Sequence, residues 1–295
     1  MITQKMIMEL RGKTGAGVMS CRNTLQETNG DLEKAAALLK EQGAAIAAKK
    51  AERTTAAGLI CGYVSPDHTS GALVEVNCET DFVALNKDFI ALAENLARQA
   101  ALTPAQDEEE FAAVPYFADE RICVRDAVTS LVAKLRENIV IGRVKTFITK
   151  NGRIQCYLHN GGRIGVLAEI ASEAGNADDA PALLQIGKEV AMQIAAANPQ
   201  FIARTDIAPA VLEEERQTYR MQALNAGKPE AVATKVAAGK LAKYLKEKCL
   251  LEQAWIKNEE ITLADYLDEQ SRTLGTAVAV ARFARFERGA DPREV

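Results

Sequence analysis

The sequence predicts an α+β protein of several domains, and three observations lead to this fold class. A strand–loop–helix pattern occurs twice, 94 residues apart, which indicates a core of two related antiparallel sheet-plus-helix subdomains. The first 43 residues contain three short helical patterns separated by glycines. Two long, highly charged helical patterns within residues 211–249 have only a narrow apolar stripe, which predicts a projecting antiparallel helical hairpin.

The repeat is clearest in one strand of each unit and in the helix that follows it. Residues 71–76 align without a gap with residues 165–170. Six core-type positions, spaced three and four apart, then coincide in the two helices: Phe89, Leu92, Ala93, Leu96, Ala97 and Ala100 in the first, and Leu183, Ile186, Gly187, Val190, Ala191 and Ile194 in the second. Both units are therefore expected to bury the same helix face.

The two units differ in the connection between strand and helix. In the first unit Asp81 and Phe82 lie on this connection, before a helix that begins near Asn86. Most aromatic side chains are buried in their own protein, so Phe82 either packs into the core or is held out for a partner. A core role would predict an apolar residue at the aligned position, which is Asn176. The difference favours an exposed, functional Phe82.

The N-terminal unit is defined by its helix breaks. Glycines at 12, 15 and 17 end the first helix, and Asn29-Gly30 ends the second. Asp31 can cap the third helix, which Gly43 closes. Residues 44–57 then form an alanine- and lysine-rich connector that is helical by propensity but has no wide apolar face.

The remaining elements follow in order from apolar periodicity and turn residues. A strand at 59–64, a turn at 65–71 and the strand after it form a hairpin, and residues 103–110 form a polar loop. A helix is predicted at 124–137, and strands 144–148 and 154–158 are predicted to pair as a hairpin around Asn151-Gly152. The second unit's helix ends at Asn198-Pro199, and a last strand covers 277–286.

These patterns divide the chain into five parts. They are a three-helix domain with linker (1–54), a first core subdomain (55–140), a second core subdomain (141–202, completed by 251–262), a helical hairpin of coiled-coil or dimerisation type (203–250) and a C-terminal module (263–295). The narrow apolar stripe of the hairpin suits either a dimer surface or a solvated arm.

Composition and charge are ordinary for a globular protein. The apolar share is 48%, the charged share is 26% and the net charge is −4, which argues against a broad basic face and so against direct nucleic-acid binding. Residues 1–54 carry nine basic and six acidic side chains, a net charge of +3. This excess is too small to predict electrostatic steering of a partner.

Cysteine and histidine usage gives no support for a metal site. The six cysteines form no C-x-x-C pair and only two histidines occur, so we expect neither zinc nor a disulfide framework. Residues 1–5 lack the apolar run of a signal peptide, and no segment of 18 apolar residues occurs. We therefore expect a reducing, cytoplasmic location and no membrane insertion.

Two glycine-containing segments fail as nucleotide-binding loops. A phosphate loop ending in Gly12-Lys13-Thr14 requires an earlier glycine where Ile7 stands. The loop at 159–165 has Asn160 in place of the first glycine of a dinucleotide fingerprint, and a strand follows it where a helix is required. No nucleophile or carboxylate pair has a supporting motif either. The sequence predicts no cofactor and no enzyme activity, and leaves open only an active site assembled from distant residues.

Four blocks resemble the family of bacterial translation elongation factor Ts. They are residues 10–21, 74–83, 159–167 and 226–230, they occur in the family's order, and they span nearly the whole chain. The resemblance implies that the N-terminal three-helix domain has a ubiquitin-associated-like fold. It also implies that the chain is a guanine-nucleotide exchange factor, which performs no covalent chemistry and acts during translation elongation.

The resemblance implies elongation factor Tu as the partner, in its GDP-bound and nucleotide-free forms. Thr80, Asp81, Phe82 and Val83 would displace magnesium and disturb the phosphate region, with Phe82 as an apolar wedge. Further contacts would come from Met19, Arg22, His159 and Ile256. Arg136 stands where the family commonly has glycine, so its contact is left open. The contact of Ile256 is left open as well, because Gln253-Ala254-Trp255 stands for the family's usual Gln-Pro-Phe. A homodimer or a 2:2 complex is also left open. The alternative is a scaffold or chaperone-like adaptor that binds partners through the N-terminal helices.

Overall fold

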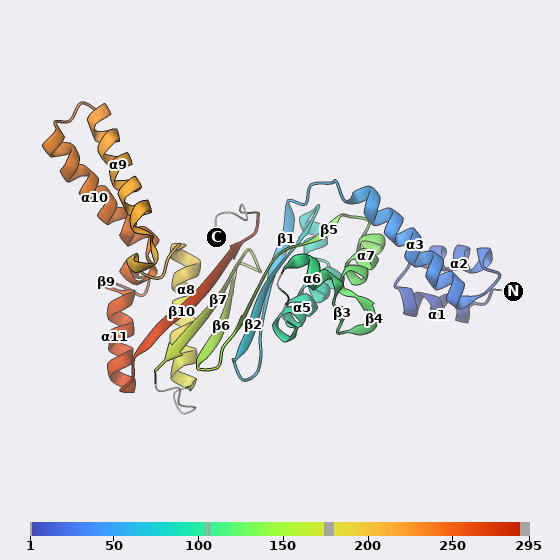
Figure 1. Ribbon diagram of the computed structural model, residues 1–295. Coiled ribbons are helices and arrows are strands. Elements are labelled where there is room, and N and C mark those ends of the chain that lie inside the picture. The colour runs from blue at the N-terminus through green and yellow to red at the C-terminus, as the bar shows by residue number, and fades with distance from the viewer. Residues whose placement is uncertain (1, 104, 106, 174–179, 290–295) are drawn as a thin grey trace.

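The computed structural model describes residues 2–103, 105, 107–173 and 180–289. The described chain is elongated (Figure 1). Its centre is a stack of four layers in which two three-stranded sheets face each other and helices cover the outer face of each sheet. A three-helix unit lies at one end of the molecule and a pair of long helices projects at the other.

The N-terminal unit consists of α1 (Gln4–Thr14), α2 (Val18–Glu27) and α3 (Leu32–Lys50). Asp31 caps α3 by accepting the backbone N–H groups of Glu33 and Lys34, as predicted. The prediction that Gly43 ends this helix is wrong, because α3 continues to Lys50. Gly43 is buried within the helix, and a Cβ there would lie 3.4 Å from the Cβ of Ala133. Gly43 therefore lies where α3 packs against the first core unit.

The first core unit has an antiparallel sheet in the order β1-β2-β5. Its elements are β1 (Ala57–Val64), β2 (Ser70–Cys78), α4 (Asp81–Ala84), α5 (Lys87–Leu102), α6 (Glu108–Ala113), β3 (Pro115–Tyr116), β4 (Asp119–Cys123), α7 (Val124–Leu135) and β5 (Ile139–Ile148). The stripe predicted on α5 is buried throughout. The acidic segment predicted as a loop forms α6 in part, because Asp107 caps it and Phe111 anchors it in the core.

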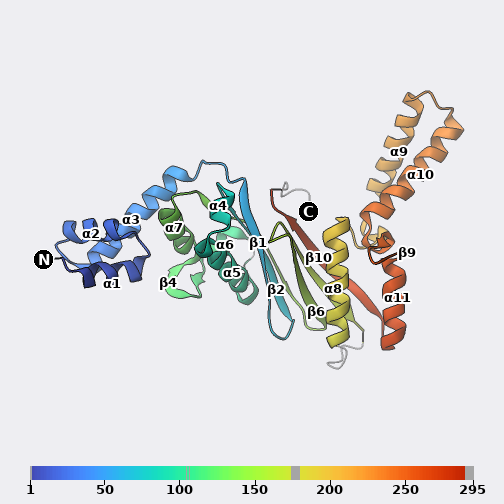
Figure 2. The ribbon, with the colours of Figure 1, turned by 180° about the vertical axis from the view of Figure 1, so that it is seen from behind.

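The second core unit has the sheet order β10-β7-β6. Its elements are β6 (Gly152–His159), β7 (Ile164–Ser172), α8 (Ala180–Ala197), the 3-10 turn η2 (Arg204–Asp206), α9 (Pro209–Asn225), α10 (Glu230–Lys248), the 3-10 turn η3 (Leu250–Glu252), β8 (Ala254–Trp255), β9 (Asn258–Thr262), α11 (Leu263–Leu274) and β10 (Val278–Glu287). The predicted stripe of α8 is buried as well. Helices α9 and α10 form the projecting hairpin seen in Figure 2.

Two expectations about the core are wrong. Strands β5 and β6 do not pair as a hairpin, since β5 pairs with β2 and β6 pairs with β7. The chain crosses from one sheet to the other at residues 149–151, which lets Phe147 and Ile154 meet in the apolar layer between the sheets. The last segment is not a separate module, because β10 is an edge strand of the second sheet. The division into core units remains a proposal, and the strand pairing moves its boundary from 140 to the turn after Ile148.

The layer between the sheets is built from equivalent residues of the two units. It contains Ile60, Leu73, Phe147, Ile154, Leu167, Ala284 and Phe286. Ile60 is equivalent to Ile154, and Leu73 to Leu167. Phe147 pairs with Gly71 in its sheet as Phe286 pairs with Gly165, so these two are equivalent as well. The units therefore pack about an approximate two-fold axis.

Polar contacts across this interface repeat the same symmetry. Arg143 donates to Glu75 at 2.8 Å and to the carbonyl of Glu287 at 2.7 Å, and its guanidinium lies over Phe286. Arg282 donates to Glu169 at 2.7 Å and to the carbonyl of Ile148 at 2.7 Å, and lies over Phe147. Each unit thus contributes one arginine to the interface. This arginine neutralises the buried glutamate of its own sheet and donates a hydrogen bond to a backbone carbonyl of the other unit.

Candidate functional site

The segment singled out in the sequence forms the short helix α4 rather than an extended connection. Thr80 caps it, since its Oγ1 accepts the Val83 N–H at 3.4 Å. Val83 and Ala84 are buried against the sheet, whereas Phe82 is 88% exposed and Leu85 is 77% exposed. The helical turn therefore directs two side chains inward and Phe82 outward, which confirms the expected exposure of this aromatic residue. The aligned Asn176 lies outside the described residues.

The start of α4 is fixed by the segment that follows α7. The Glu137 carboxylate accepts the Thr80 N–H at 3.0 Å and the Thr80 hydroxyl at 2.7 Å. The preceding residue, Glu79, accepts the Asn138 N–H at 2.6 Å and a bond from Arg53 at 3.3 Å. The Asn138 N–H, and after it Arg53, lower the pKa of Glu79. We call the segment Thr80–Val83 the tip. This network ties the tip to the segment that follows α3 and to the segment that follows α7.

Asp81 is held from the second unit. Arg288, directly after β10, places one guanidinium nitrogen 3.1 Å from Asp81 Oδ1 and 3.0 Å from the Gly58 carbonyl oxygen. A groove of about 460 Å³ lies beside this contact, with α4 and the start of α5 on one side and the turn after β6 on the other. Leu85 and Leu158, both exposed, are among its lining residues.

His159 is the last residue of β6 and follows Leu158, which lines the groove. Its Nδ1 is 3.1 Å from the Tyr157 hydroxyl, and its side chain is exposed. Gly161 and Gly162 have φ angles of +63° and +83°, so the turn uses the freedom of glycine. The Gly162 carbonyl accepts the Ile60 N–H at 2.7 Å, which docks the turn on β1. The structure thus brings the end of β6, where His159 lies, close to the 80–83 segment.

The other predicted contact residues lie elsewhere. Met19 and Arg22 are exposed on α2, which lies at the far end of α3 from α4 (Figure 2). Ile256 is partly exposed at the β8–β9 turn, where its N–H donates to the buried Gln193 of α8. These residues and the tip do not form one compact site. A single partner that met them all would have to cover most of the length of the chain.

Two residues beside the tip were not among the predicted site residues. Glu137 lies next to Arg136, which ends α7 with a φ of +61°, and its local sequence gave no hint of the bond to Thr80. Arg288 is separated from Asp81 by two hundred residues of chain, so no local pattern could connect them. Only the packing of β10 beside β7 brings it there.

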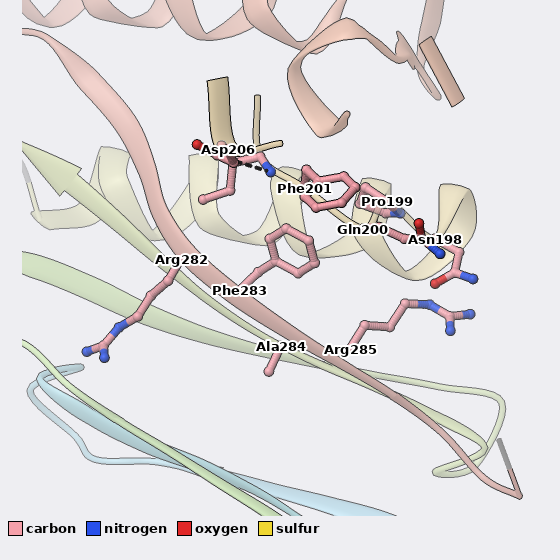
Figure 3. A pocket seen from close by; sticks show the side chains of 10 residues that line it. Asn198, Pro199, Gln200, Phe201, Asp206, Arg282, Phe283, Ala284 and Arg285 are labelled. Atoms are coloured by element: carbon pink, nitrogen blue, oxygen red, sulfur yellow. Dashed lines mark hydrogen bonds between the residues drawn. The ribbon is translucent and has the colours of Figure 1, made fainter. Parts of the chain in front are cut away.

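A second cavity, of about 260 Å³, lies between the end of α8 and β10 (Figure 3). Phe201 and Phe283 supply its apolar walls. Its charged groups are already paired: Asp206 accepts the N–H groups of Ile202 and Ala203, and Arg285 donates to Glu287 at 2.9 Å. This cavity therefore lies at a packing boundary between two elements, and the hydrogen bonds of Asp206 and Arg285 are made within the protein.

Two of the cysteines have thiols that burial keeps protonated. All six cysteines are free, and burial raises the pKa of Cys61 and of Cys156 to about 12, so both thiols stay protonated. Among the described residues no group of three or more His, Cys, Asp or Glu side chains is placed to hold a metal ion. No helix within the described ranges is both long and apolar enough to cross a membrane.

The fold and the site define a class of protein in which two packed sheet-and-helix units expose an apolar side chain, Phe82, on a short helix. Comparison with known proteins then gives the family. The model of the family described as Elongation factor TS matches residues 79–290. Elongation factor Ts of Clostridium botulinum (strain Eklund 17B / Type B) is 47% identical over 289 residues, which cover 98% of this chain and 93% of that protein. Elongation factor Ts of Clostridium novyi (strain NT) is 45% identical with the same coverage. The chain belongs to the elongation factor Ts family, and its role is in translation elongation.

Proposed function

We propose that this protein is a guanine-nucleotide exchange factor for elongation factor Tu. It binds Tu, disturbs the site of magnesium and phosphate, and releases GDP without covalent chemistry. The single observation that carries this proposal is the exposure of Phe82 on a short helix that is anchored on both sides. A large apolar side chain presented to solvent on a rigid turn is a feature that partner binding accounts for.

The exchange mechanism follows from linkage. If the factor lowers the affinity of Tu for GDP, then GDP must lower the affinity of Tu for the factor by the same ratio. The factor must therefore make its best contacts with the form in which the phosphate region is disturbed. Phe82 can supply such a contact because burying one phenylalanine contributes roughly 1.5–3 kcal/mol.

The remaining residues of the tip have supporting roles in this proposal. Asp81 helps to hold the displaced arrangement of Tu, while Thr80 and Val83 fix the helix that carries Phe82. His159 adds a contact from the end of β6. Met19 and Arg22 bind a separate surface of the nucleotide domain, and Ile256 a third surface.

The test measures release of a fluorescent GDP analogue from the matching Tu. Phe82→Ala is expected to lower the stimulated release rate roughly tenfold or more, since 1.4 kcal/mol corresponds to a factor of ten. Leu102→Ala is the matched control. Leu102 is also an exposed apolar residue, and it ends α5, a helix of 16 residues that is about 24 Å long and begins near Phe82.

The outcomes separate the candidate functions. Stimulated release that is lost with Phe82→Ala and kept with Leu102→Ala supports the wedge. Stimulation that survives both changes keeps the exchange function but moves its mechanism to the other contacts. Binding of Tu without faster release by the folded wild-type protein would overturn the proposal in favour of the adaptor.

A further inference from the structure

Arg288 joins three segments that lie far apart in the sequence. Its guanidinium bonds the Asp81 carboxylate on α4 and the Gly58 carbonyl at the start of β1. Its backbone N–H donates to the carbonyl of Arg163 at 2.9 Å, in the turn that carries His159. One residue therefore links the tip of the first unit with the neighbouring turn of the second.

The arginine is the better-fixed partner of its ion pair. Its side chain is 28% exposed, whereas that of Asp81 is 74% exposed. The strand end that carries it is held as well, because Gly289 donates to Glu75 at 3.4 Å and Glu75 is paired with Arg143. The backbone that carries Arg288 is therefore well fixed, and its side chain can restrain the more exposed Asp81 carboxylate.

Helix α4 needs such support. It has four residues, and its backbone bonds are few, with Ala84 N–H donating to Thr80 and Leu85 N–H to Asp81. A helix this short is not stable by itself in water. Glu137 fixes its first residue from within the first unit. Arg288 is the corresponding anchor from the second unit.

We propose that Arg288 is a positioning residue that holds Asp81, and with it α4, at the orientation in which Phe82 meets the partner. This inference rests on the proposed exchange function and deepens it. It makes the second unit a part of the tip, because the end of β10 sets the geometry of a helix in the first unit. Arg288 acts through Asp81 and need not touch the partner.

The test compares full-length Arg288→Gln and Arg288→Lys with wild type. The concentration of factor is varied against Tu carrying the fluorescent GDP analogue, so that the maximal release rate and the half-saturating concentration are separated. Ion pairs of this exposure contribute up to about 1 kcal/mol, so Arg288→Gln is expected to lower the maximal rate about two- to fivefold. Arg288→Lys keeps the charge and should recover part of the loss. Arg272→Gln, exposed on α11, is the control for net charge.

A second measurement follows α4 in the free protein. Amide hydrogen exchange at Ala84 and Leu85 should become faster in Arg288→Gln and stay unchanged in Arg272→Gln, because only the former loosens the short helix. In an Asp81→Asn background, Arg288→Gln should add little further loss of release rate, since the pair is already broken.

Each outcome bears on one proposal. Lower maximal rate, faster exchange of the α4 amides and non-additivity with Asp81→Asn together support the positioning role. Unchanged release and unchanged amide exchange in a folded Arg288→Gln protein would overturn it while leaving the exchange function intact. A wild-type protein that fails to release GDP would instead overturn the exchange function, and the amide measurement would still decide whether Arg288 holds α4.

Discussion

The two core units have the same topology but carry different features at their edges. Each has a three-stranded antiparallel sheet, a long helix on its outer face, a short hairpin and a second helix before the last strand. In each, a buried glutamine of the long helix bonds the tip of the hairpin: Gln99 with Pro115 and Phe117, and Gln193 with Ala254 and Ile256. These shared parts build the core of each unit.

The unshared parts differ in a consistent way. The second unit has the projecting α9–α10 pair where the first has the short α6, whereas the residues aligned with α4 lie outside the described ranges. The turns that dock one unit on the other differ too. Ser65, Asp67 and Thr69 brace one turn with side-chain bonds, whereas Gly161 and Gly162 shape the other. The differing helices and turns contribute no residue to the apolar layer between the sheets. The two units can therefore differ there while their cores stay equivalent.

The largest expected effect tests the symmetry of the core. Phe147→Ala and Phe286→Ala each remove a buried ring from equivalent places between the sheets, so each should lower the free energy of unfolding by about 3–5 kcal/mol. Equilibrium unfolding in urea measures both. The two losses should agree within about 1 kcal/mol if the sites are equivalent. A small loss for one and a large loss for the other would break the comparison.

A smaller effect tests a place where equivalent positions differ. Gly62 of the first unit corresponds to Cys156 of the second, and a Cβ at Gly62 would overlap the Cys156 sulfur. Gly62→Ala is therefore expected to lower the free energy of unfolding by about 1–3 kcal/mol through overpacking. Combining it with Cys156→Ala should recover part of that loss, because the sulfur is removed. Losses that simply add in the double variant would show that the two positions do not share one space.

The smallest effect concerns the turn at residues 65–69, which Asp67 braces, and it depends on pH. Bonds from Ser65 and then Thr69 lower the pKa of Asp67 to about 2. Because this pKa is below the usual value of about 3.9, the stabilisation is fully present above about pH 4 and is lost as the pH falls through 2. Asp67→Asn should thus be less stable than wild type at pH 5 and equally stable near pH 2. Asp268→Asn, exposed on α11, is the control, and thermal unfolding at both pH values is the measurement. A constant difference at both pH values would contradict the role of the charge.

The sequence alone determined much of this protein, because the responsible signals can be read from local spacing or from the comparison of similar segments. Apolar spacing predicted the buried faces of α5 and α8, capping residues predicted the start of α3, and the unmatched Phe82 predicted the exposed tip. The four blocks of residues predicted the family. The apolar spacing and the capping residues depend on residues a few positions apart, which is the range over which helix and turn chemistry acts. The exposure of Phe82 was instead predicted by comparison with the aligned position 94 residues further along the chain.

Tertiary structure alone decided which strands pair and which residues hold the site. The turn at Asn151-Gly152 suits a hairpin, yet β5 and β6 join different sheets because doing so buries Phe147 and Ile154 between them. Gly43 stays within α3 because α7 packs against it. Arg288 meets Asp81 because β10 closes the second sheet. In every case the deciding free energy comes from contacts between segments distant in the chain, which local patterns do not encode.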